Sequence, residues 1–139
     1  EKSVMPARME LLRKKPVIIL DGGHNEGCAL ALASFIEKHL KNKRIIMLSS
    51  LMADKDYDSY LKTVLPFADT FIATKADVPR ALPSDELMKC ASAFCKNCHD
   101  ISEPLKAVKA AVNITQNDDV LIVCGSFYLA GDIRDILFD

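Results

Sequence analysis

Short apolar runs alternate with amphipathic segments along the whole chain. The two strongest runs, residues 16–20 and 120–124, are rich in β-branched side chains and predict strands buried on both faces. Weaker runs predict three further strands, at 44–48, 70–73 and 99–101. Because helical segments separate these strands, the pattern predicts right-handed βαβ units. The expected fold is a doubly wound, Rossmann-like α/β domain, with a mostly parallel sheet and helices on both faces.

Between the predicted strands, apolar residues recur at helical spacing. The first such stripe covers residues 26–40, others begin near residues 56, 84 and 104, and a closing helix lies near 133–137. Asp56 and Ser84 are expected to cap their helices, and Pro104 stands in a first turn, where no amide hydrogen bond is lost. We expect the third stripe to continue through a single helical face, formed by Leu87, Ala91, Phe94 and Cys95.

Length and composition restrict the class of protein. The chain has 139 residues, half of them apolar and 27% charged, which is typical of one soluble globular domain. Eighteen basic residues nearly balance nineteen acidic ones, so we expect no nucleic-acid partner, and no apolar run is long enough for a membrane partner. The chain starts at Glu1 rather than Met, and we expect a fragment of a longer protein.

Five cysteines, an odd number in a chain without a secretory pattern, indicate free thiols and a cytoplasmic location. The string from Cys95 to His99 reads C-x-x-C-H, as in haem attachment, and Cys90 extends it toward a metal-binding spacing. A simpler interpretation makes Cys95 and Cys98 small core side chains. We expect no metal site in this chain, and we expect Asp54 and Asp56 to be solvated or capping residues.

The glycines are confined to two places. Gly22, Gly23 and Gly27 follow the first strong strand, and Gly125 and Gly131 follow the last one. In an open α/β sheet, ligands bind outside the carboxyl ends of the strands, where glycine lets the backbone approach closely. Either these loops are tight turns without a ligand, or they form one shared binding edge.

The residues of the first glycine loop favour a binding edge. Asp21 is placed to accept a hydroxyl group, and His24 and Asn25 lie at a helix start, where amides attract phosphate or carboxylate. The chain has neither the G-x-G-x-x-G dinucleotide pattern nor the G-K-[ST] of a P-loop. The usual phosphate cradle is therefore not in this sequence.

Several segments together resemble one family. Residues 6–10 (P-A-R-M-E) and 21–25 (D-G-G-H-N) resemble the P-G-R-x-E and D-G-A-H-N patterns of folylpolyglutamate and dihydrofolate synthases, which belong with the Mur-type ligases. Residues 52–56 contain the family's D-K-D, residues 79–81 its P-R-A, and residues 125–128 its G-S-x-Y. The matches occur in the family's order and span nearly the whole chain. Ala7 and Gly23 each depart from the pattern by one small residue.

The resemblance implies a C-terminal ligase domain, with residues 1–12 as an interdomain linker and 13–139 as the domain, working with an absent N-terminal ATPase domain. That domain would hold most of the ATP and Mg²⁺. The implied enzyme activates a folate or dihydropteroate carboxylate as an acyl phosphate, which L-glutamate attacks. By motif position, Arg8, Asp21 and Asn25 would contact the nucleotide. His24 and Ser126 would be catalytic, near the phosphate and the incoming amino acid.

Two other functions remain open from the sequence. A peptidoglycan Mur ligase shares the fold and the Asp-His-Asn start, although the D-K-D and G-S-x-Y elements favour the folate branch. A stand-alone α/β module that binds a small anion at the His24 helix start would need no partner domain. We expect a monomer, and we expect the isolated chain to be inactive and to bind ATP weakly.

Overall fold

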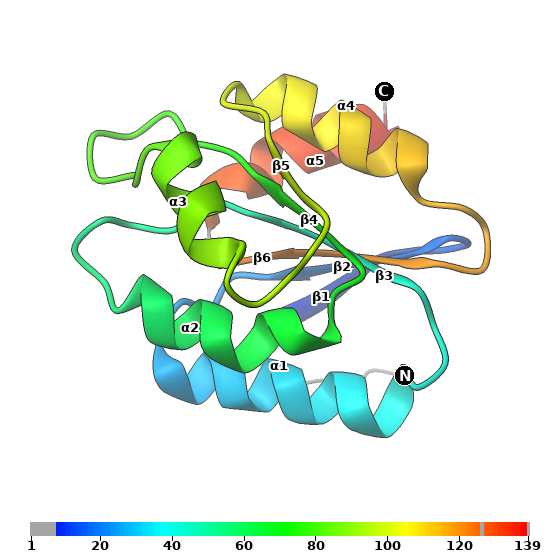
Figure 1. Cartoon of the computed structure of the whole chain (residues 1–139). Coiled ribbons are helices and arrows are strands. Elements are labelled where there is room, and N and C mark those ends of the chain that lie inside the picture. The colour runs from blue at the N-terminus through cyan, green and yellow to red at the C-terminus, as the bar shows by residue number, and fades with distance from the viewer. Residues whose placement is uncertain (1–7, 126, 139) are drawn as a thin grey trace.

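The computed structural model describes residues 8–125 and 127–138 of the chain. Six strands form one sheet in the order β1-β2-β6-β3-β4-β5, in which all neighbours are parallel except β1 and β2 (Figure 1). The strands are β1 (Met9–Lys14), β2 (Val17–Asp21), β3 (Ile45–Ser49), β4 (Thr70–Ala73), β5 (Cys98–Asp100) and β6 (Val120–Cys124). This arrangement confirms the expected mostly parallel α/β sheet.

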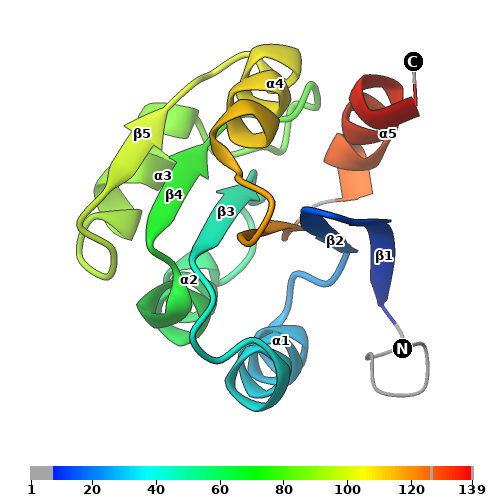
Figure 2. The same ribbon diagram turned by 90° about the vertical axis from the view of Figure 1, so that its right-hand side faces the viewer.

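Helices cover both faces of this sheet, as the sequence predicts. Helices α1 (Glu26–His39), α2 (Tyr57–Val64) and α3 (Ser84–Ala91) pack on one face, and α4 (Pro104–Ile114) and α5 (Ala130–Phe138) pack on the other (Figure 2). Short 3₁₀ turns, Leu65–Phe67 and Phe127–Leu129, follow α2 and precede α5. None of the described helices is long and apolar enough to cross a membrane.

Alternation along the central strands produces two cores. In β6, Val120 and Ile122 face the α1–α3 side, whereas Leu121 and Val123 face the α4–α5 side. All five residues of β6 are buried because the strand lies in the middle of the sheet with helices above and below it. This is why β6 and β2 read as continuous apolar runs rather than as alternating ones.

Strand β1 was not predicted. It pairs antiparallel with β2 at the sheet edge, and its register shifts between Leu11 and Arg13. Its residues alternate poorly, with Met9 buried and most of the others exposed or half-buried, so their pattern resembles a polar linker. The strand also runs across the boundary that the sequence suggests between residues 12 and 13.

The start and the end of α3 differ from the prediction. Ser84 is the first helical residue and is buried, while Pro83 occupies the capping position without a side-chain hydrogen bond. The helix ends at Ala91, so Phe94 and Cys95 lie in the turn that follows rather than on one helical face. They still pack against the core, because the chain turns back over β4 before entering β5.

The cysteines pack as the simpler interpretation proposes. All five are free thiols, with Cys95 and Cys124 buried. The Cys98 thiol donates to the Cys95 carbonyl at 3.1 Å, and burial raises the pKa of Cys98 to about 11. Within the described ranges, no group of three or more His, Cys, Asp or Glu side chains is arranged to hold a metal ion.

Candidate functional site

The two glycine loops meet at one edge of the sheet, as expected. Strands β2 and β6 are parallel neighbours, with Asp21 opposite Cys124 at their carboxyl ends. Just beyond that pair, the Gly125 N–H donates to the Asp21 carbonyl at 3.2 Å. The loop after β2 and the turn after β6 are therefore hydrogen-bonded to each other at the position where an open α/β sheet binds ligands.

The Asp21 side chain is buried at this edge of the sheet and does not project into solvent. It is only 3% exposed, and its Oδ1 accepts the N–H of Gly23 at 2.9 Å. Burial raises the pKa of this carboxyl to about 6, although the Gly23 hydrogen bond and the positive charge of Arg8 act in the opposite direction. Asp21 thus shapes the loop, and its Oδ2 has no hydrogen bond from any described residue.

His24 and Asn25 follow at the start of α1. The Asn25 side chain caps this helix, since its Oδ1 accepts the Cys28 N–H at 2.8 Å. The half-buried His24 has a buried Nδ1 without a hydrogen-bond partner among the described residues. An imidazole nitrogen in that condition is available to a ligand that reaches the loop. Asn25 therefore has a structural task, whereas His24 has an unused polar atom.

Arg8 is brought to the same edge by the unpredicted strand. Its carbonyl accepts the Gly22 N–H at 3.2 Å, and the next residue, Met9, pairs with Asp21. The Arg8 side chain is exposed, close enough for its charge to act on Asp21. Pairing of β1 with β2 therefore places three of the predicted site residues, Arg8, Asp21 and His24, around one loop. Ser126 lies outside the described residues.

Close packing explains why glycine occupies these loops. A Cβ built on Gly125 would lie 2.3 Å from Leu51 Cδ2 and 2.7 Å from Ser49 Oγ, and the backbone φ of Gly125 is +83°. A Cβ on Gly23 would lie 2.4 Å from Cys28 Cβ. An alanine at position 23 would therefore overlap the Cys28 side chain of this protein.

Three residues near this edge were not singled out by the sequence. The Phe127 ring packs on Gly22, where a built Cβ would lie 1.9 Å from its Cε1. Ser49 donates to the Cys124 carbonyl at 2.7 Å, which ties β3 to the end of β6. Tyr60 belongs to the predicted apolar stripe of α2, its buried hydroxyl lies next to the Cys124 thiol, and burial raises its pKa. Apolar periodicity predicts burial of this residue but not the neighbour of its hydroxyl.

The D-K-D and P-R-A segments also lie at the carboxyl edge, because they follow β3 and β4. Met52 and Ala81 form an antiparallel bridge between the two connections. A small apolar cluster beneath the bridge contains Met52, Ala76 and Ala81. Asp56 caps α2 by accepting the Ser59 N–H at 3.2 Å, as predicted. Asp54 is exposed but paired with Arg80, a contact that sequence spacing does not reveal.

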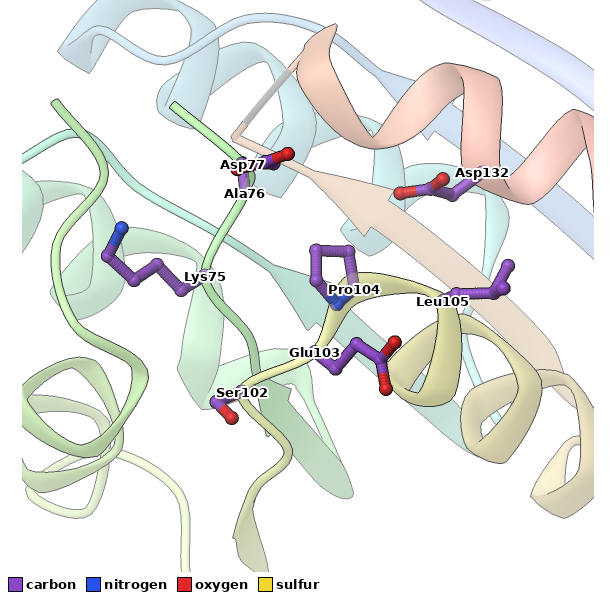
Figure 3. A pocket seen from close by; sticks show the side chains of 8 residues that line it. All are labelled: Lys75, Ala76, Asp77, Ser102, Glu103, Pro104, Leu105 and Asp132. Carbon is purple, nitrogen blue, oxygen red and sulfur yellow. The ribbon is translucent and has the colours of Figure 1, made fainter. Parts of the chain in front are cut away.

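A cavity of about 530 Å³ opens beside this edge, between the ends of β4 and β5 and the starts of α4 and α5 (Figure 3). It is lined by Lys75, Ala76, Asp77, Ser102, Glu103, Pro104, Leu105 and Asp132. Burial and the neighbouring charges of Asp135 and Asp77 raise the pKa of Asp132. The lining carries both signs of charge, and no candidate from the sequence is part of it.

The chain is similar to a known protein family and to several of its members. A family model described as Mur ligase, glutamate ligase domain matches residues 7–127. The dihydrofolate synthase/folylpolyglutamate synthase of Bacillus subtilis (strain 168) is 28% identical over 133 residues, which cover 96% of this chain and 30% of that protein. The folylpolyglutamate synthase of Lacticaseibacillus casei is also 28% identical, over 95% of this chain and 29% of its own length.

Solved structures of folylpolyglutamate synthases are also similar to this chain. The Mycobacterium tuberculosis folylpolyglutamate synthase complexed with ADP aligns with a TM-score of 0.81 and 25% identity, over 96% of this chain and 32% of that one. The Escherichia coli FolC in complex with DHPP and ADP aligns with a TM-score of 0.85 at 22% identity, over 96% of this chain and 31% of that one, which supports the fold. The chain thus spans about a third of the length of these relatives.

Proposed function

Because the chain belongs to the Mur ligase family of glutamate ligase domains, we propose that it is the C-terminal domain of an ATP-dependent ligase that adds L-glutamate to folates. In this proposal residues 1–12 form the linker and 13–139 the ligase domain. The proposed enzyme is a folylpolyglutamate synthase. The Bacillus subtilis relative is named for both folylpolyglutamate synthase and dihydrofolate synthase activity, and an enzyme with both activities would also accept dihydropteroate. The proposed setting is a monomeric protein in the cytoplasm.

One observation carries the proposal from the structure: the segments of Arg8, Asp21, His24 and Gly125 are hydrogen-bonded neighbours at one sheet edge. They lie in three segments that are separated along the sequence, around residue 8, at residues 21–24 and at residue 125, and each segment matches a different motif of the family. A sheet edge suits a phosphorylated, anionic substrate when it has a helix start, an exposed arginine and an imidazole nitrogen without a partner among the described residues. Tight turns without a ligand would need none of these side chains.

The residues of this edge fit part of a nucleotide site. The Arg8 guanidinium is suited to phosphate oxygens, which it can contact through two parallel N–H groups. Asp21 Oδ2, which has no hydrogen bond from a described residue, is the atom that would accept a hydrogen bond from a ribose hydroxyl. The positive charge of Arg8 acts to lower the pKa of this carboxyl and so favours its charged form. We propose that an N-terminal ATPase domain binds Mg²⁺ and makes most of the contacts with ATP. The C-terminal domain described here would close over that ATP site.

The reaction we propose proceeds in two steps. A carboxylate oxygen of the folate attacks the γ-phosphorus of ATP, which yields an acyl phosphate and ADP. The amine of glutamate then attacks the acyl carbon, the amine loses a proton, and inorganic phosphate leaves as the amide bond forms. In this scheme His24 Nδ1 contacts a phosphate oxygen or takes up the amine proton, and Arg8 stabilises the phosphate charge. Closure of the two domains protects the acyl phosphate from water.

The first test uses the protein that contains this chain together with the segment that precedes it. ATP-dependent incorporation of labelled glutamate into tetrahydrofolate and into dihydropteroate is measured for the wild type and for Arg8→Ala, Asp21→Ala and His24→Ala. We expect incorporation in the wild type and a loss of about 10²-fold or more for His24→Ala, since general acid–base residues contribute about 10²–10⁴-fold.

Circular dichroism checks that each variant remains folded. His39→Ala serves as the matched control, because His39 is exposed in the last turn of α1, at the opposite end of that helix from His24. It is expected to change turnover little. Failure of the wild type with both acceptors would contradict the folate ligase. Peptidoglycan Mur substrates would then be tried first, and simple anion binding at the His24 loop second.

A further inference from the structure

An exposed ion pair closes the two connections that follow β3 and β4. Arg80 donates from Nε and from a terminal nitrogen to the two Asp54 carboxylate oxygens, each at 3.2 Å. The Asp54 and Arg80 side chains are 59% and 51% exposed, and the pair lowers the pKa of Asp54. Exposed pairs contribute little to overall stability. The bidentate contact between Arg80 and Asp54 at the ligand edge therefore indicates a role other than stabilising the fold.

The backbone beneath the pair is also bonded across the two connections. The Ala53 N–H donates to the Arg80 carbonyl at 2.7 Å, and the Leu82 N–H donates to the Leu51 carbonyl at 2.8 Å. Together with the Met52–Ala81 bridge, these contacts join residues 50–56 (the β3 loop) and residues 74–83 (the β4 loop) into one unit. The Asp54–Arg80 pair lies at the exposed end of that unit.

The joined loops in turn contact the turn after β6. Leu51 packs so closely on Gly125 that a Cβ built there would lie 2.3 Å from Leu51 Cδ2. The backbone of Leu51 is held by Leu82 of the β4 loop. A change in how the β3 and β4 loops meet would therefore be transmitted through one tightly packed side chain to Gly125, which has a left-handed backbone conformation and no space to spare.

We propose that Asp54 and Arg80 are positioning residues for Gly125, acting through Leu51. The inference rests on the proposed function, in which Gly125 belongs to the sheet edge that binds the phosphorylated substrate. The pair fixes the β3 loop against the β4 loop, and the β3 loop holds the Gly125 turn in place. Breaking the pair leaves the domain folded but lets the turn move, so binding of the amine substrate weakens.

Hydrogen exchange measured by mass spectrometry on the full-length protein tests the positioning without any need for activity. In Asp54→Asn and in Arg80→Gln, amides of residues 50–56 and of 121–129 should exchange about threefold to fivefold faster than in the wild type. Arg80→Lys keeps the charge but not the two-pronged geometry and should be intermediate. The reversed pair, Asp54→Arg with Arg80→Asp, should restore slow exchange.

Lys106→Gln is the matched control, because it removes another exposed ion pair, that of Lys106 with Glu103 on α4. It should leave exchange in both segments unchanged. If residues 121–129 exchange at the wild-type rate in Asp54→Asn and Arg80→Gln, the proposal is wrong, whatever the enzyme does.

Steady-state kinetics then measures the effect of the Asp54–Arg80 pair on glutamate binding. The KM for glutamate should rise about threefold to fivefold in Asp54→Asn, with kcat little changed, and the difference should shrink at high salt because exposed charges are screened. An unchanged KM in an active enzyme whose 121–129 segment exchanges faster would overturn the link to substrate binding. A wild type without ligase activity would instead count against the proposed function, and the exchange result would still decide the positioning.

Discussion

Replacing Gly125 by alanine tests whether the turn at the ligand edge is as tightly built as its geometry indicates. A side chain at φ +83° costs about 1–2 kcal/mol. The added Cβ would also overlap Leu51 Cδ2 at 2.3 Å and Ser49 Oγ at 2.7 Å, and overpacking of a core adds about 1–3 kcal/mol. We therefore expect Gly125→Ala to lower the free energy of unfolding by about 2–5 kcal/mol, a large share of the 5–15 kcal/mol of a typical domain.

Urea unfolding of the 139-residue chain, followed by circular dichroism, measures this loss. With a slope of about 2 kcal/mol per molar urea, the midpoint should fall by about 1–2.5 M. The control is Gly131→Ala in α5, where a built Cβ meets nothing within 4 Å. That change should be neutral or stabilise by up to about 1 kcal/mol, because alanine favours the helix.

A second background separates the two causes of the loss. In Leu51→Val the overlapping Cδ2 is absent, so adding Gly125→Ala should cost less there than in the wild type. The reasoning is refuted if Gly125→Ala unfolds at the wild-type midpoint. An equal fall for Gly131→Ala would refute it as well, because the loss would then not depend on the turn.

Three further outcomes follow from the same edge. Since the folded pKa of Asp21 is about 6 and its ordinary value is 3.8, its charge opposes folding with nearly full effect above pH 6, and this penalty falls between pH 6 and pH 4. The difference in unfolding free energy between Asp21→Asn and the wild type should therefore favour the variant by about 2–3 kcal/mol at pH 7 and vanish near about pH 3 in urea titrations. Gly23→Ala should destabilise by about 1–3 kcal/mol, and by less when Cys28→Gly removes the contact at 2.4 Å, as a thermal-melt double-mutant cycle would show; an equal cost in both backgrounds would exclude that contact. Because burial raises the pKa of Cys124 to about 12, its thiol should stay unlabelled by a maleimide at pH 7 until the chain is unfolded, and labelling of Cys124 in the native chain would show that the edge opens.

Local signals in the sequence were sufficient for most of the secondary structure. The apolar runs at residues 16–20 and 120–124 predicted β2 and β6, because a strand covered on both faces is apolar along nearly all of its length. Asp56 and Pro104 predicted helix starts, since the capping and first-turn preferences that they express act over only a few residues. Such preferences depend little on the rest of the fold.

The two incorrect predictions of secondary structure, at β1 and at the end of α3, have a common explanation. β1 is an edge strand, and an edge strand with a polar side needs no regular apolar alternation, so its pattern resembled a linker. The helical stripe beyond Ala91 was misleading because the chain turns while its apolar residues continue to face the core. In both places the partner segment, rather than the residues themselves, decides the conformation.

By itself, the sequence determined the α/β alternation, the grouping of the glycines after two strands and the order of the family motifs. Only the tertiary structure decided what these residues do next to one another. It turned the Asp21 carboxyl inward onto Gly23, made Asn25 a helix cap and joined Asp54 to Arg80. It also left His24 Nδ1 without a hydrogen-bond partner in the part of the chain that is described. These contacts depend on strand order and on side-chain direction over long sequence separations. Motif spacing along the chain carries neither.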